Sequence, residues 1–134
     1  MDWVDSVLVW TKDDTYEAVD INRVENNTQY ISSLLSQYGY TSGITTIVKN
    51  RTILSFDDIA SINRVENNLN KLKTCFYTPT GWQDMKTWIA GMKFDYTDAY
   101  RYENNLNLLF NLANILIDNF VYCGTFSAGE EVIL

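Results

Sequence analysis

Histidine is absent from this sequence of 134 residues, and proline, cysteine and glycine are scarce, at one, two and six residues. Without histidine the chain lacks the commonest general base and metal ligand, which excludes Ser–His and Cys–His nucleophile systems. Cys75 and Cys123 follow no metal-binding spacing, and two free thiols are a simpler expectation than a disulfide between them. No glycine-rich phosphate loop is present. We therefore expect no catalytic site, no metal and no cofactor.

Positive charge and long apolar runs are also in short supply. Ten lysines and arginines face 17 acidic residues, and the net charge of −7 would repel a nucleic-acid backbone. No apolar run approaches the roughly 20 residues that span a bilayer, and the N-terminus has no signal-peptide pattern. We expect neither nucleic-acid binding nor membrane insertion. The hydrophobic fraction of 46% indicates one globular domain over residues 1–134.

A six-residue motif organises the chain. Asn-Arg-Val-Glu-Asn-Asn at residues 22–27 recurs letter for letter at 63–68, which is 41 residues later. A third copy, Tyr-Arg-Tyr-Glu-Asn-Asn, follows at 100–105 after a further 37 residues. Such repetition indicates one structural unit used three times.

Apolar residues surround each copy at alternating spacings of three and four, which places them on one face of a helix. We predict helices over about 15–38, 56–76 and 97–119. Asp14 or Thr15 would start the first and Thr97 with Asp98 would cap the third, while Gly39 would end the first. The three stripes are Ile21, Val24, Thr28, Ile31, Leu35 and Tyr38; Ile62, Val65, Leu69, Leu72 and Phe76; and Ala99, Tyr102, Leu106, Leu109, Ala113 and Leu116.

Three further segments complete the predicted fold. Residues 44–48 are β-branched and favour a short strand, with an ordered loop docked on the helices as the alternative. Residues 82–92 have helical spacing and predict a short helix. Residues 120–134 contain two apolar stretches around Ser-Ala-Gly and predict a β-hairpin. The predicted fold is mainly α, a small bundle of three repeat-related helices and a short helix, with a C-terminal β-hairpin.

The repeated polar residues are the main candidates for a site. Asn, Arg and Glu at these positions lie beside the apolar stripe, where they can bond to neighbouring loops and helices or form a ligand site where copies meet. We favour the first interpretation, because a motif present three times is usually architecture. Trp82 and Trp88 are candidate interface or ligand aromatics, although their spacing also suits a core. The motif candidates are Asn22, Arg23, Glu25, Asn26, Asn63, Arg64, Glu66, Asn67, Arg101, Glu103 and Asn104.

Beyond these patterns, the sequence resembles a family of phage proteins. The motif-bearing helices, Ser-Gln-Tyr-Gly-Tyr at 36–40 and Cys-Gly-Thr-Phe-Ser-Ala-Gly-Glu at 123–130 resemble segments of minor structural proteins, of the tail or baseplate type, in tailed phages and prophages of Gram-positive bacteria. The resemblance spans about residues 15–131. It implies a virion protein, assembled in the bacterial cytoplasm, that forms homo-oligomers of ring or threefold symmetry and contacts other phage structural proteins. It transfers no catalytic residue.

Three functions are therefore compared. The first is a non-enzymatic virion structural protein acting through self-assembly and protein–protein contacts. The second is a host-surface or carbohydrate-binding adhesin module of the same particle, with a host-surface receptor as its partner. The third is an enzyme that uses the carboxylates of Glu25, Glu66 and Glu103, although nothing in the sequence pairs them at a known spacing. We favour the first.

Overall fold

The structure is a computed structural model that describes residues 2–52 and 59–123, with side chains described as far as residue 118. Three helices form its frame: α1 (Ala18–Ser36), α2 (Ile59–Cys75) and α3 (Tyr96–Cys123). All three were predicted from the repeat. α1 is shorter than predicted at both ends, whereas α3 begins one residue earlier and ends four residues later.

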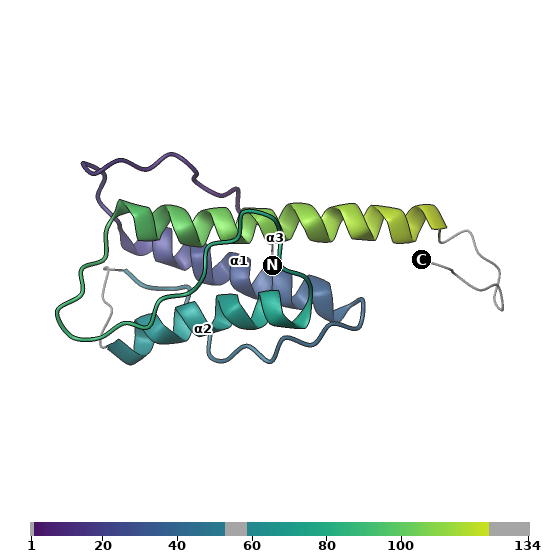
Figure 1. Ribbon diagram of the computed structural model, residues 1–134, viewed down its shortest axis with the longest axis horizontal. Coiled ribbons are helices and arrows are strands. Elements are labelled where there is room, and N and C mark those ends of the chain that lie inside the picture. The colour runs from purple at the N-terminus through teal and green to yellow at the C-terminus, as the bar shows by residue number, and fades with distance from the viewer. Residues whose placement is uncertain (1, 53–58, 124–134) are drawn as a thin grey trace.

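All three helices point in the same direction (Figure 1). An up-and-down bundle alternates the direction of successive helices and joins them by short loops. Here an extended segment precedes each helix instead, and it carries the chain back along the outside of the bundle before the next helix begins (Figure 1). Each repeat is thus an extended segment followed by a helix, and the described parts of these segments are residues 2–17, 37–52 and 76–95.

The core consists of equivalent residues from the three repeats. The offsets of 41 and 37 residues align the predicted stripes, and the first five aligned positions are buried apart from the half-buried Phe76. The ends of two stripes were predicted wrongly, because Tyr38 is 39% exposed and Leu116 is half-buried. Burial of each large apolar side chain contributes about 1.5–3 kcal/mol. Thr28 satisfies its hydroxyl on the carbonyl oxygen of Val24, at 2.8 Å. The aligned sets are Ile21, Ile62 and Ala99; Val24, Val65 and Tyr102; Thr28, Leu69 and Leu106; Ile31, Leu72 and Leu109; and Leu35, Phe76 and Ala113.

Acidic residues precede two of the helices, two or three residues away from the predicted caps. Glu17 precedes α1, and its N–H donates to Asp20 at 2.8 Å. Asp95 precedes α3; its N–H donates to Asp98 at 3.1 Å, and its own carboxylate accepts from the N–H of Thr97 at 2.9 Å. Thr97 is therefore inside the helix and Asp95 is the cap. Acids are favourable here because they face the positive end of the helix dipole.

Gly39 ends α1 as predicted. It has a φ of +90°, and the N–H of Tyr40 reaches back to the carbonyl oxygen of Leu35 at 3.0 Å. This is the Schellman arrangement, in which glycine avoids the strain that a Cβ atom would meet at positive φ.

The predicted C-terminal β-hairpin is wrong where it can be compared. α3 continues through Cys123, so residues 120–123, which were assigned to the first strand, are helical. The helical spacing of Leu109, Ala113 and Leu116 continues past residue 119, and no helix breaker occurs before Gly124. The rest of the predicted hairpin, residues 124–134, lies outside the described residues.

Two shorter predictions also need correction. Residues 82–92 form no helix, and residues 44–48 form no strand; neither a β-strand nor a fourth helix occurs within residues 2–52 and 59–123. Both segments are ordered loops docked on the helices. Their backbone groups bond to asparagine side chains of the motif, which replace the hydrogen bonds of a helix or a sheet.

Candidate functional site

The three motif arginines and the three motif glutamates pair in a cycle around the bundle. Arg23 of α1 contacts Glu103 of α3 at 2.8 Å, Arg64 of α2 contacts Glu25 of α1 at 3.2 Å, and Arg101 of α3 contacts Glu66 of α2. Each helix therefore gives an arginine to one neighbour and a carboxylate to the other. We name these six residues the ion cycle.

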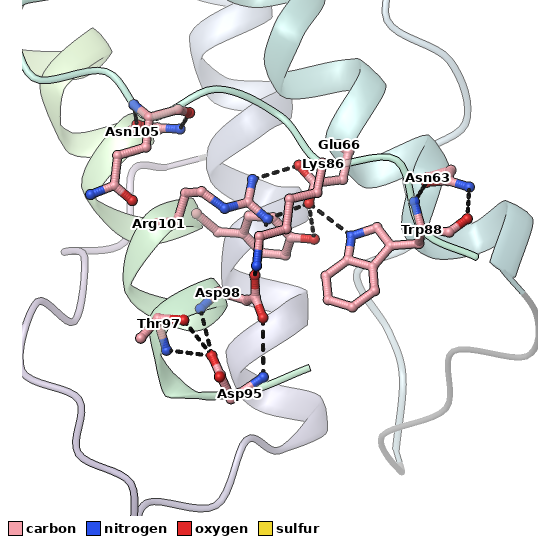
Figure 2. A network of polar contacts seen from close by, with 11 residues as sticks. Asn63, Glu66, Lys86, Trp88, Asp95, Thr97, Asp98, Arg101 and Asn105 are labelled. Carbon is pink, nitrogen blue, oxygen red and sulfur yellow. Dashed lines mark hydrogen bonds and ion pairs between the residues drawn. The ribbon is translucent and has the colours of Figure 1, made fainter. Parts of the chain in front are cut away.

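Glu66 is the most densely bonded carboxylate of the ion cycle (Figure 2). It accepts two hydrogen bonds from the guanidinium of Arg101, one of them at 2.7 Å. The indole Nε1 of Trp88 and the hydroxyl of Tyr102 each donate to Glu66 at 2.9 Å. Arg101 also contacts Asp98 at 3.3 Å, and Lys86 contacts the same carboxylate at 2.7 Å. A fully buried charge is tolerable only when it is satisfied in this way.

The other two glutamates have fewer donors. Glu103 accepts from Nε of Arg23 at 2.9 Å and from the backbone N–H of Val7 at 2.8 Å. Glu25 accepts from Arg64 and from a second arginine, Arg51, which also donates to the carbonyl oxygen of Val48 at 2.7 Å. Residue 51 lies outside the motif, so its role was not predicted.

Burial sets the protonation behaviour of this cluster. It raises the pKa of Glu103, although the bonds from Arg23 and the N–H of Val7 act in the opposite direction. Burial alone would lower the pKa of Arg101, but the hydrogen bonds and charge of Glu66 raise it above its ordinary value. Burial also raises the pKa of Tyr102 well above 10.0, which keeps its hydroxyl protonated as a donor to Glu66. Arg101 therefore stays charged and remains a donor to Glu66.

The motif asparagines hold the extended segments. In each such asparagine clamp, the side-chain oxygen accepts from the N–H of one residue and the side-chain nitrogen donates to the carbonyl oxygen of the same residue. The last asparagine of each motif clamps the segment that leads into its own helix, with distances between 2.7 and 3.4 Å. The clamped pairs are Asn27 with Val4, Asn68 with Thr45, and Asn105 with Gln83.

The first asparagine of the motif clamps the segment that follows its helix. Asn22 binds the backbone of Arg51 at 3.0 and 2.8 Å, and Asn63 binds that of Trp88 at 2.7 and 3.1 Å. Each extended segment between helices is therefore fixed at two points, one on each helix beside it. The N-terminal segment also contacts α3, since Val7 donates to Glu103. The third copy has Tyr100 in place of the first asparagine, so α3 cannot form the corresponding clamp on this segment.

The candidates named from the sequence thus divide into two groups. The ion cycle and the first asparagines meet as one structural cluster. The middle asparagines lie outside it: Asn26 donates to the carbonyl oxygen of Asp2 at 2.8 Å, Asn67 is exposed and Asn104 is half-buried. Sequence reasoning overlooked the last asparagines, although their strict repetition marked them.

The two candidate tryptophans occupy different environments. Trp88 is 4% exposed, and its indole nitrogen is bound to Glu66, so it is a core residue rather than a surface platform. Trp82 is half-buried against the core, with its Nε1 atom buried and Lys73 lying 6.0 Å from its ring.

Within the described residues, no group of three or more cysteine or acidic side chains could hold a metal ion. None of the described helices is both long and apolar enough to cross a membrane. No protein-family model, curated protein or solved structure matches the chain.

Proposed function

We propose that the chain is a non-enzymatic structural protein of a phage particle, a component of the tail or baseplate that acts through self-assembly and contacts with other phage proteins. One observation carries the non-enzymatic part: the charged groups of the repeated motif are all engaged inside the fold. In all three copies the arginine and the glutamate bond to each other's helices within the bundle, as an architectural role requires.

A carboxylate hydrolase would need a different arrangement. Glycosidases use two carboxyl groups that flank an open cleft, about 5–10 Å apart, with one of them protonated as the acid. Glu25, Glu66 and Glu103 are each 0 or 1% exposed, and each already holds at least one arginine. Water and substrate have no access to them, so this cluster supports a structural function.

The assignment to a phage particle rests on the sequence resemblance. The adhesin alternative depended on exposed Trp82 and Trp88, or on a tyrosine cluster around Tyr96, Tyr100 and Tyr102. Trp88 and Tyr102 are buried and Trp82 is half-buried, whereas Tyr96 and Tyr100 are 41 and 36% exposed. The two exposed tyrosines are what remains in favour of the adhesin alternative.

The proposal is tested on particles released by cells that encode the chain. Particles purified on a density gradient are analysed by quantitative mass spectrometry, with a cytoplasmic enzyme of the same cells as the contamination control. We expect the chain to sediment with the particles at a fixed ratio to the major tail protein. A chain found only in the soluble fraction, at the level of the control enzyme, would overturn the proposal.

A further inference from the structure

Each extended segment gives a hydrogen bond to a glutamate of the ion cycle. In the second and third segments the donor is a side chain, and the donor residue is also fixed by an asparagine clamp. In the N-terminal segment the donor is a backbone N–H, and no clamp from the described residues holds it, because Tyr100 replaces the asparagine of α3. The three pairs are Arg51 with Glu25, Trp88 with Glu66, and Val7 with Glu103.

Residues 5–14 of the N-terminal segment form a loop with a single polar attachment, and we name them the N-terminal strap. The strap (purple in Figure 1) runs along the outside of the bundle, between the clamp of Asn27 and the start of α1. Among the residues that the structure describes, the 2.8 Å bond from Val7 to Glu103 is the one hydrogen bond between the strap and a helix. Little apolar packing reinforces it, because three consecutive side chains are 38, 39 and 80% exposed: Val7, Leu8 and Val9.

The carboxylate that holds the strap is buried at 0% exposure. The titratable groups that face Glu103 are Arg23 and Asp20 of α1 and Tyr16 of the N-terminal segment, and Arg51 of the second segment faces Tyr16 in turn. Arg23 contacts Glu103 at 2.8 Å and Asp20 at 2.9 Å. Burial raises the pKa of Tyr16 well above 10.0, so its hydroxyl stays neutral.

Protonation weakens what Glu103 can hold, because a hydrogen bond to an ionised carboxylate is roughly twice as strong as one to a neutral group. Burial raises the pKa of Glu103 above its ordinary value of 4.5, and the charge of Asp20 acts in the same direction against the bonds from Arg23 and Val7. An acid with a raised pKa in the folded state takes up its proton there at a higher pH than in the unfolded chain. Uptake of this proton therefore favours the folded over the unfolded chain, and Arg23 keeps Asp20 as its partner.

We propose that the N-terminal strap is released by acid: it is docked on α3 while Glu103 is ionised and is freed when Glu103 takes up a proton. The second and third segments stay docked, because the asparagine clamps that fix them contain no titratable group. The inference goes beyond the proposed function and does not depend on it.

The test is amide hydrogen exchange of the full chain, followed by NMR spectroscopy and expressed as protection factors, so that the intrinsic effect of pH on exchange is removed. We expect the protection of the Val7 amide to fall about tenfold between neutral pH and pH 4.5, as a charge-assisted bond becomes a neutral one. The amides of Arg51 and Trp88, which donate to Asn22 and Asn63, are internal controls and should keep their protection.

Two variants identify the group that titrates. Glu103→Gln resembles the protonated carboxyl, so the Val7 amide should have about tenfold lower protection already at neutral pH and show no further fall in acid. Asp84→Asn is the matched control: it also exchanges a carboxylate for an amide, but the side chain of Asp84 is 90% exposed on the third segment. This variant should show the same fall in acid as the parent.

The parent decides the question even if Glu103→Gln folds poorly. The carboxyl carbon of Glu103, followed by NMR in the parent, should titrate with the same midpoint as the protection of Val7. Different midpoints, or protection of Val7 that does not change with pH, would overturn the proposal. A simultaneous loss of protection at Arg51 and Trp88 would also overturn it, since the whole bundle would then be opening. So would a folded Glu103→Gln variant that keeps the fall in acid.

Discussion

The same arginine occurs in three environments of the bundle, and replacing it by methionine in one repeat at a time tests the ion cycle. Methionine keeps an unbranched, partly buried side chain and removes only the charge and its hydrogen bonds. The side chains of Arg101, Arg23 and Arg64 are 5, 11 and 22% exposed. The partner carboxylates also differ in what remains once the arginine is gone.

The structure ranks the three losses. Arg23→Met leaves the buried Glu103 with the N–H of Val7 alone, and Arg101→Met leaves Glu66 with two neutral donors. Breaking a buried pair from one side lowers the free energy of unfolding by about 3–5 kcal/mol. Arg64→Met should lower it by about 1 kcal/mol, because Arg64 is the most exposed of the three.

In the Arg64→Met variant, Glu25 also keeps one cationic partner, because it stays paired with Arg51. Domains of this size are stable by about 5–15 kcal/mol, so the two larger losses should be evident as a fall in melting temperature on the order of 10 °C.

Urea unfolding followed by circular dichroism at 222 nm gives the three free energies under identical conditions. Because the substitution is the same each time, differences in helix propensity and in side-chain volume largely cancel. Equal losses in the three variants, or a largest loss for Arg64→Met, would refute the pairing scheme on which the ranking depends.

Three further changes test the core, a helix start and the broken repeat. Val65→Asp places a charge at a site that is 2% exposed and should abolish the cooperative thermal transition; a variant that melts like the parent would disprove the stripe assignment. Asp95→Ala should lower the free energy of unfolding by about 1 kcal/mol at neutral pH. Hydrogen bonds from Thr97 hold the pKa of Asp95 below 3.8. The contribution of Asp95 to stability is therefore present above pH 3.8 and is lost as the pH falls through the folded-state pKa. The free energies of unfolding of parent and variant, measured by urea titration, should converge at low pH. Tyr100→Asn supplies the asparagine that α3 lacks, and a clamp on the N-terminal segment should slow hydrogen exchange of the backbone amides near Trp10. Unchanged exchange at these amides would show that the N-terminal segment cannot reach residue 100.

Much of the fold could be predicted because each copy of the repeat has the same apolar spacing and therefore forms the same helix. Apolar spacing of three and four gave the helices and the buried stripes, and a glycine at the end of a stripe gave Gly39 as the end of α1. The polar motif was correctly placed beside the stripe. Its partners could not be predicted, because helix direction decides which arginine meets which glutamate, and apolar stripes suit parallel and antiparallel packing alike.

The errors have a shared cause. Residues 44–48 were assigned from β-branched side chains and residues 82–92 from helical spacing. Their conformation is instead set by Asn68, Asn105 and Asn63, which lie on helices that these loops contact. A side-chain amide that bonds both backbone groups of one residue can replace a strand neighbour, and no local pattern reveals it. The hairpin was assigned from two apolar stretches around Ser-Ala-Gly, and residues 120–123 of the first stretch belong instead to α3.

The parallel direction of the helices has a consequence for how quickly the chain can fold. The ion cycle joins residues that are 35, 39 and 80 positions apart in the sequence. An up-and-down bundle can begin from a local helical hairpin, but here no two helices can meet until a returning segment of the chain has been ordered between them. Loop-closure entropy must therefore be overcome before the first native helix pair forms, which raises the contact order of an otherwise helical protein. We expect this chain to fold more slowly than antiparallel bundles of its length, with helix content forming well before the bundle closes.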